Sequence, residues 1–180
     1  MKDSLTEITN ITSVVDRLRN FARKSTGKKI GKVNLGTTAG KIVNLLSDSA
    51  QRSAVELRIE CMDGLPSLYL SEKDLEQMFF ALIANAIQAA QDKKNCRLVI
   101  SGEQHGKFIE LRFSDNCGGI EPGNLVRIFE PFFTTKPEGK GTGLGLCIVK
   151  DVVTRAGGQV RVESEFGKGA TFIVTFPAKN

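Results

Sequence analysis

Residues 129–146, FEPFFTTKPEGKGTGLGL, are the stretch that most constrains the fold. The stretch begins with aromatic side chains, passes two threonines and Lys136, and ends in alternating glycines before an apolar run. Glycines allow sharp bends and close approach of a ligand, and a glycine-rich turn that enters a helix offers free N–H groups to an anion. The stretch therefore predicts a phosphate-binding lid with an aromatic anchor.

An ordinary turn is the alternative, because most glycine-rich loops bind nothing. The stretch matches neither G-x-x-x-x-G-K-[ST] nor a G-x-G-x-x-G that follows a strand. The rest of the chain has to decide between these two interpretations.

Composition favours one globular domain with a short appendage, since the chain has 180 residues, 41% hydrophobic and 25% charged. The net charge is +5, and the densest basic run, RKSTGKK at 23–29, is typical of a solvated linker and does not predict a nucleic-acid partner. The four cysteines form no C-x-x-C pair, which disfavours a zinc site or a disulfide scaffold and favours a reducing compartment. With no signal peptide and no long apolar run, we expect a soluble, cytoplasmic piece.

Apolar periodicity divides the chain into an amphipathic helix over 1–24, a linker over 25–32 and a domain over 33–180. Within the domain we expect helices over 37–49, 72–91 and 144–156, the second capped by Ser71. Strands are expected over 55–62, 97–103, 107–115, 159–165 and 170–177, with tight turns in two hairpins. The fold class is therefore α+β, a two-layer sandwich whose mostly antiparallel sheet carries helices on one face.

Two polar side chains stand out against this pattern. Asn85 lies inside the helix over 72–91, where it is either a satisfied polar residue or an oxygen ligand for a hard cation such as Mg²⁺. Asp115 ends a strand in SDNCGGI, residues 114–120. It either forms an Asx turn or accepts a hydrogen bond from the amino group of a base. The single histidine, His105, falls in a predicted surface turn.

Five segments, in order, resemble the ATP-binding domain of sensor histidine kinases: LEQMFFALIANAIQAA, SDNCGGI, FEPFFTTK, GKGTGLGL and FGKGATF. That domain belongs to the wider family of gyrase, heat-shock chaperone, histidine kinase and mismatch-repair ATPases. The resemblance covers residues 33–177, and five ordered motifs are far more specific than one. The lid is most similar to that of the nitrogen-regulation type of sensor kinase.

The resemblance implies a Bergerat-type fold that binds Mg²⁺ and ATP between the long helix and the lid. By position, Asn85 resembles the Mg²⁺ ligand, Asp115 resembles the adenine-reading carboxylate, and Lys136 joins Asn85 as a catalytic residue near the phosphates. The other residues that the resemblance places around ATP are Gly119, Ile120, Phe132, Thr135, Gly141, Thr142, Gly143, Leu144, Gly145, Leu146 and Thr171. Phe129, Phe132 and Phe133 resemble the aromatic anchor.

The resemblance also implies partners. The helix over 1–24 is similar to the second helix of a dimerisation hairpin, and no H-E motif precedes it. We therefore expect a fragment that transfers the γ-phosphoryl group of ATP to a histidine on a helix outside this chain and does not autophosphorylate alone. A homodimer and a response regulator are implied for the full-length protein, and a membrane anchor elsewhere in it is left open.

Three positions depart from the family pattern. Ala81 stands where Asn is frequent, Cys117 where the first glycine after the aspartate is usual, and Ala170 where Thr is usual. Because alanine cannot be a general base, Ala81 also disfavours ATP hydrolysis of the gyrase or chaperone kind. The alternatives are a serine kinase or anti-sigma regulator of the same fold, and a degenerate nucleotide-binding scaffold. The N-terminal helix and the phenylalanine-rich lid disfavour the first, and the intact Asn85, Asp115 and GTGLGL disfavour the second.

Overall fold

The computed structural model describes residues 29–90, 93, 95–137 and 141–178. The predicted helix over 1–24 lies outside the described residues, so it remains a prediction. Among the residues described, no helix has both the length and the apolar character needed to span a membrane.

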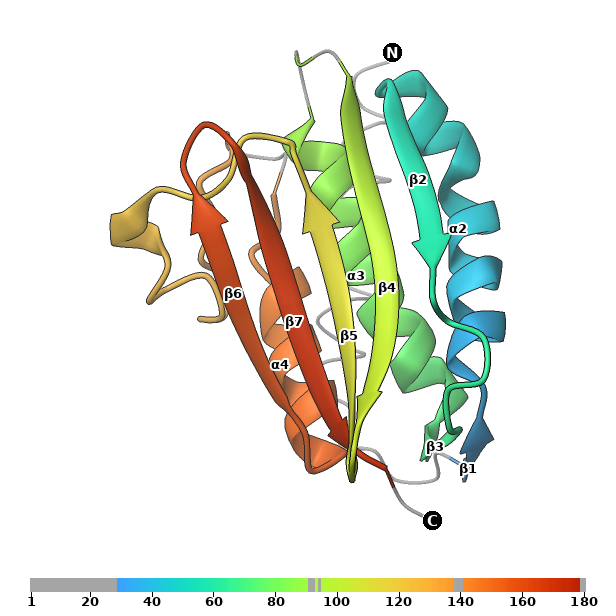
Figure 1. Ribbon diagram of the computed structural model, residues 1–180. Helices are drawn as coiled ribbons and strands as arrows, with labels where there is room; N and C mark the ends of the chain where they lie inside the picture. Colours follow the sequence, from blue (N-terminus) through green and yellow to red (C-terminus); the bar gives the residue numbers. More distant parts are fainter. Residues whose placement is uncertain (1–28, 91–92, 94, 138–140, 179–180) are drawn as a thin grey trace, which may run out of the picture.

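A five-stranded sheet forms one layer of the molecule, in the order β2-β4-β5-β7-β6 (Figure 1). Its strands are β2 (Val55–Glu60), β4 (Cys96–His105), β5 (Phe108–Asp115), β6 (Gln159–Glu165) and β7 (Gly169–Pro177). The β2–β4 pair is parallel and the other three pairs are antiparallel. The mostly antiparallel mixed sheet expected from the sequence is therefore confirmed.

Three helices cover one face of this sheet: α2 (Leu35–Arg52), α3 (Glu72–Ala89) and α4 (Gly145–Arg155) (Figure 1). Helix α2 begins at Asn34, whose Oδ1 accepts a hydrogen bond from the Thr37 backbone N at 2.8 Å. That bond satisfies one of the free N–H groups of the first turn. The opposite face of the sheet carries no helix from the described residues, so the two-layer sandwich is also confirmed.

The core lies between the two layers because the strands alternate in sequence. Ile109, Leu111 and Phe113 of β5 are at most 1% exposed, whereas the side chains between them point to the outer face. Phe79 of α3 packs edge-on against Phe113 with ring centroids 5.2 Å apart. The buried face of α3 includes Ile83 and Ile87, which sequence periodicity had not singled out.

Two short strands were not predicted. Strand β1 (Ile30–Val33) pairs antiparallel with β3 (Leu68–Ser71) in a separate two-stranded sheet. Strand β1 takes up the end of the stretch expected to be a linker, residues 25–32. Ser71 occupies the N-cap position of α3 as expected, but its side chain makes no capping bond within the described structure. The short 3-10 helix η1 (Pro122–Asn124) follows β5.

Candidate nucleotide-binding site

Helices α3 and α4 run side by side in opposite directions, which places the start of α4 near the middle of α3. A Cβ built on Gly145 would lie 3.9 Å from the Cβ of Ala81. At the other end of α4, Nη1 of Arg155 lies 3.2 Å from Oδ2 of Asp74, near the start of α3. Asn85 is one helical turn beyond Ala81, so it lies close to the N-terminal end of α4.

The N-terminus of α4 has the properties of an anion site. Leu144 is its N-cap, and no side chain among the described residues caps the helix. The first turn also contains no acidic residue. The first N–H groups of a helix have no intrahelical partners, and the helix dipole attracts negative charge to them. A helix terminus with these properties is suited to bind a phosphate group.

A lysine from the lid, Lys136, contacts polar side chains of α3. The Lys136 ammonium donates to Oδ1 of Asn85 at 3.4 Å and also to Oε1 of Gln88. Burial lowers the pKa of Lys136 because the charged form loses solvation. A cation thus already lies against the amide oxygen that the sequence proposed as a Mg²⁺ ligand. The amide oxygens of Asn85 and Gln88 fit a hard cation at this point, since amide oxygens are suitable ligands for one.

Gln88 was not predicted as a site residue. It lies three residues after Asn85, and side chains at that spacing share one face of a helix. The polar pair Asn85 and Gln88 in residues 78–89, which are otherwise apolar, was the available signal.

Asp115 ends β5 on the side of the sheet that faces the helices, in line with buried Phe113. Its Oδ1 accepts a hydrogen bond from the Cys117 backbone N at 2.8 Å, which is the Asx turn considered as one alternative. Desolvation raises the pKa of Asp115, and backbone hydrogen bonds from Cys117 and Ala170 oppose that shift. The turn fixes the orientation of a half-buried carboxylate, and such a group can still accept from a base.

The glycine loop after Asp115 packs on the turn between β6 and β7. Gly119 has a φ of +73°, and a Cβ there would lie 2.2 Å from the carbonyl oxygen of Glu165. The backbone N of Ile120 donates to Oγ of Ser164 at 2.8 Å. Glycine at 119 is therefore required by close backbone packing as well as by conformation.

The aromatic residues of the lid have different roles. Phe129 packs edge-on against Phe172 of β7 with ring centroids 6.5 Å apart, and the Arg127 guanidinium lies 4.5 Å from the ring centre of Phe133. These two rings anchor the lid. Phe132 instead is 61% exposed and has a φ of +66°, which is unusual for a bulky residue. The expected anchor role is thus seen for Phe129 and Phe133 and not for Phe132.

Contacts between the two ends of the lid involve Gly143. The Phe132 backbone N donates to the Gly143 carbonyl oxygen at 3.0 Å. Gly143 has a φ of +63°, and a Cβ there would lie 2.2 Å from the Phe132 carbonyl carbon. The Leu144 backbone N donates to Oγ1 of Thr142 at 3.4 Å, and Leu144 itself is fully buried. These contacts shape the lid where it enters α4.

The remaining predicted lid residues are less constrained by contacts. Thr135 is exposed, and Leu146 packs partly buried against the core. A Cβ on Gly141 would lie 2.4 Å from Oγ1 of Thr134, so glycine there lets the lid segments on either side of it lie close together.

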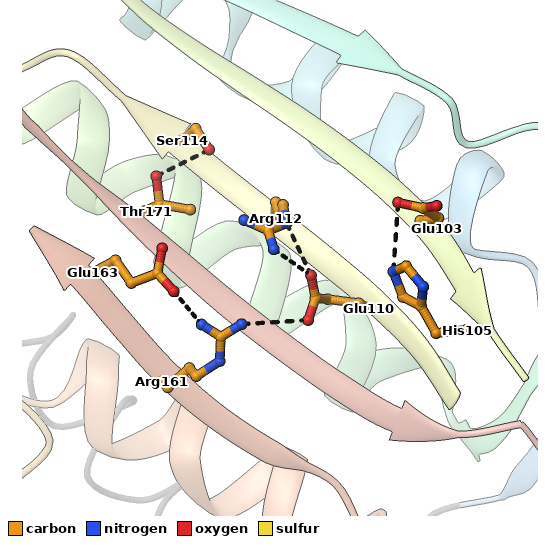
Figure 2. A network of polar contacts seen from close by, with 8 residues as sticks. All are labelled: Glu103, His105, Glu110, Arg112, Ser114, Arg161, Glu163 and Thr171. Atoms are coloured by element: carbon orange, nitrogen blue, oxygen red, sulfur yellow. Dashed lines mark hydrogen bonds and ion pairs between the residues drawn. The ribbon is translucent and has the colours of Figure 1, made fainter. Parts of the chain in front are cut away.

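Thr171 lies on β7, paired with Ser114 of β5. It borders an open hollow with Asp115 at the ends of β5, β6 and β7. Its hydroxyl, however, donates to Oγ of Ser114 at 3.1 Å on the outer face of the sheet (Figure 2). Side chains alternate along a strand, so the neighbouring Ala170 faces the helices instead. The Thr171 side chain therefore lies on the outer face of the sheet, and its contact with ATP stays a prediction.

Comparison with known proteins decides the family. The model of the histidine kinase-, DNA gyrase B- and HSP90-like ATPase family matches residues 70–180, more than half of the chain. The chain belongs to this ATPase family. The resemblance noted in the sequence is thereby confirmed.

The similar curated proteins include sensor kinases. The two-component sensor PprA of Pseudomonas aeruginosa is 35% identical over 178 residues, which cover 95% of this chain and 19% of that protein. The sensor histidine kinase ZraS of Escherichia coli K12 is 33% identical over 171 residues, covering 95% of this chain and 36% of that protein. The chain thus spans about a fifth to a third of the length of these relatives. Their names do not specify the nitrogen-regulation type, which stays a prediction.

Solved structures agree on the fold. Full-length ShkA in complex with AMPPNP matches with a TM-score of 0.83 and 25% identity, over 97% of this chain and 37% of that one. The catalytic domain of histidine kinase ThkA matches with a TM-score of 0.72 and 24% identity, over 83% of this chain and 96% of that one. The ThkA match shows that the described fold is the one that a histidine kinase catalytic domain adopts.

Proposed function

We propose that this chain is the ATP-binding catalytic domain of a sensor histidine kinase. In this proposal it binds Mg–ATP and transfers the γ-phosphoryl group to a histidine on a dimerisation domain. The observation that carries the proposal is the convergence of an uncapped helix terminus, the Asn85 amide oxygen and the Lys136 ammonium on one space. Membership of the ATPase family and the AMPPNP bound to ShkA support a nucleoside triphosphate as the ligand.

Within the proposal, each end of the nucleotide has its own residues. The N–H groups at Gly143–Gly145 and the Lys136 ammonium receive the phosphates. Asp115 receives the exocyclic amino group of adenine, with Gly119 beside the ring. A bound Mg²⁺ would neutralise phosphate charge, and Asn85 is the residue that would hold it.

We favour phosphoryl transfer over ATP hydrolysis because of the residue that lies near the proposed position of the phosphates. Ala81 lies one turn before Asn85, beside the start of α4, and has no group that can activate water. Phosphoryl transfer between bound groups depends mainly on positioning and charge stabilisation, which Lys136 and the helix terminus can supply.

The acceptor histidine is proposed to lie on another domain. His105, the histidine of this chain, is exposed at the end of β4 and pairs with Glu103 at 3.4 Å. Figure 2 shows it on the outer sheet face, which is the face opposite to the helices that hold Asn85. An acceptor helix, a homodimer of the complete protein, a response regulator and a cytoplasmic location belong to the same proposal. So does the division into residues 1–24, 25–32 and 33–180.

Calorimetric titration with AMPPNP tests the binding step. We expect binding that requires Mg²⁺, with a weaker affinity for the Asp115→Asn variant by on the order of 1–3 kcal/mol. Ser114→Ala is a matched control, because Ser114 is next to Asp115 but faces outward. No binding by the unaltered chain, or equal binding by Asp115→Asn, would contradict the assignment.

A further inference from the structure

Two cysteines, Cys96 and Cys117, lie just beyond the last residue pair of the β4–β5 ladder, which is Leu98 with Asp115. The backbone N of Asn116 donates to the Arg97 carbonyl oxygen at 3.3 Å. The Arg97 backbone N donates to Oδ1 of Asn116 at 2.7 Å. One backbone bond and one side-chain bond thus hold Asn116 against Arg97, and Cys96 and Cys117 are the next residues on the two segments.

The two side chains are close enough for a disulfide to form, because they share a hydrogen bond. Disulfides span Cα separations of about 4.4 to 6.8 Å, a range that includes neighbouring positions on adjacent backbone segments. Both residues are buried on the helix side of the sheet, at 3% and 2% exposure.

The two thiols also interact with each other in the reduced protein. Burial, followed by the side-chain hydrogen bond with Cys96, raises the pKa of Cys117 to about 12. All four cysteines of the chain are free. The pair is thus a reduced dithiol that is already aligned across two strands.

Cys117 connects this dithiol to the candidate site. Its backbone N holds Oδ1 of Asp115 at 2.8 Å, and its carbonyl oxygen accepts from the Lys93 ammonium at 3.1 Å. Gly118 and Gly119 follow directly, both with positive φ. Any shift of Cys117 therefore moves the backbone that orients the proposed adenine-reading carboxylate.

We propose that Cys96 and Cys117 form a reversible disulfide that weakens nucleotide binding. The oxidant is a low-molecular-weight disulfide such as oxidised glutathione. One cysteine thiolate attacks a glutathione sulfur and releases glutathione thiolate, which takes up a proton. The other thiolate then attacks the mixed disulfide, forming the Cys96–Cys117 bond and releasing the second glutathione. The two thiols lose two electrons and two protons, and oxidised glutathione becomes two reduced glutathiones.

Burial determines when this exchange occurs. A thiol that is 2% exposed and largely protonated reacts slowly, so the exchange requires local opening of the loop after β5. A nucleotide seated on Asp115 and Gly119 opposes that opening. This coupling rests on the proposed function, and by linkage the effect of the disulfide on ATP equals the effect of ATP on the disulfide.

The test uses a Cys61→Ser background, because Cys61 is exposed and its thiol is accessible to glutathione. The protein is equilibrated in glutathione buffers of graded potential, quenched, alkylated and mapped by mass spectrometry. We expect a Cys96–Cys117 cross-linked peptide that disappears on reduction. AMPPNP affinity of the oxidised form should fall about tenfold, within the usual range for coupled sites. Saturating AMPPNP, which binds the reduced form more tightly, should then raise the midpoint reduction potential of the pair by about 30 mV for each tenfold difference in affinity.

Cys96→Ser is the matched variant, since it retains Cys117 but cannot form the bond. Its AMPPNP affinity should not change between reducing and oxidising buffers. Absence of the cross-linked peptide at potentials that fully oxidise exposed Cys61 in the unaltered chain would overturn the modification site. A complete cross-link with unchanged affinity would overturn the coupling. Failure of the reduced protein to bind AMPPNP would overturn the proposed function instead, while the cross-link still decides the site.

Discussion

Gly143→Ala tests how the lid is held, because the structure assigns glycine at this position to contacts within the lid. Alanine would have to adopt a φ of +63° and place its Cβ 2.2 Å from the Phe132 carbonyl carbon. The left-handed conformation costs about 1–2 kcal/mol. Relief of the overlap moves Phe132 and breaks its bond to the Gly143 carbonyl oxygen, for about 1 kcal/mol more.

We expect this loss to appear mainly in nucleotide binding. The lid joins the core through Phe129, which packs on Phe172, and Phe133, which packs on Arg127, and neither ring contact involves Gly143. The circular-dichroism spectrum should therefore be retained, and Tm should fall by only a few degrees. AMPPNP affinity should fall at least tenfold, which corresponds to about 1.4 kcal/mol.

Gly145→Ala is the control for this prediction. Gly145 is the first residue of α4, its φ lies outside the left-handed region, and a Cβ there would be at an ordinary 3.9 Å from Ala81. Alanine is a better helix former than glycine, so stability should be unchanged or higher. The resemblance places both glycines around ATP without distinguishing them, whereas the structure predicts different effects of alanine at the two positions. Unchanged affinity in Gly143→Ala, or equal losses in both variants, would refute the reasoning.

Three further changes should have distinct effects. Asp115→Asn should weaken AMPPNP binding yet leave stability at pH 7 equal or higher. Burial raises the pKa of Asp115, so ionisation of Asp115 lowers the stability of the unaltered chain as pH rises through the folded-state pKa. Unfolding free energies of both proteins at pH 4 and pH 7 check this, and a large loss of stability in Asp115→Asn at pH 7 would contradict it. Gln88→Ala removes one hydrogen-bond acceptor of the Lys136 ammonium, so amide hydrogen exchange at residues 131–137 should become faster in the nucleotide-free protein. Unchanged exchange rates would show that this contact does not hold the lid. Arg155→Met removes the 3.2 Å ion pair with Asp74 and should lower unfolding free energy by on the order of 1–2 kcal/mol in urea denaturation, and no change would mean that the pair is not stabilising.

The larger elements could be predicted because their apolar patterns are long. Strand β5 alternates over eight residues, and α3 repeats apolar side chains over 18 residues. Strands β1 and β3 have four residues each, too few for alternation to stand out from chance. Their pairing depends on a contact between segments more than thirty residues apart, such as Ile30 with Ser71.

The site was predictable in its chemistry and less so in its geometry. Three polar side chains stood out in the sequence: Asn85 in an apolar part of a helix, Asp115 at the end of a strand and Lys136 in a glycine-rich stretch. Each makes a defined contact in the structure. The orientation of Thr171 could not be predicted, because the single-residue alternation of β7 decides which of two neighbouring side chains faces the helices. The pairing of Cys96 with Cys117 depends on strand register, which the sequence of one chain does not contain.

Phosphoryl transfer from radiolabelled ATP tests the central claim most directly. The chain would be assayed alone and joined to a dimerisation hairpin that carries the acceptor histidine, each with and without Mg²⁺. The account predicts Mg²⁺-dependent, acid-labile and base-stable label on the hairpin histidine, abolished by Lys136→Met together with Asn85→Ala, and no label on the chain alone. Label on His105, or acid-stable label on a serine or threonine, would contradict the account.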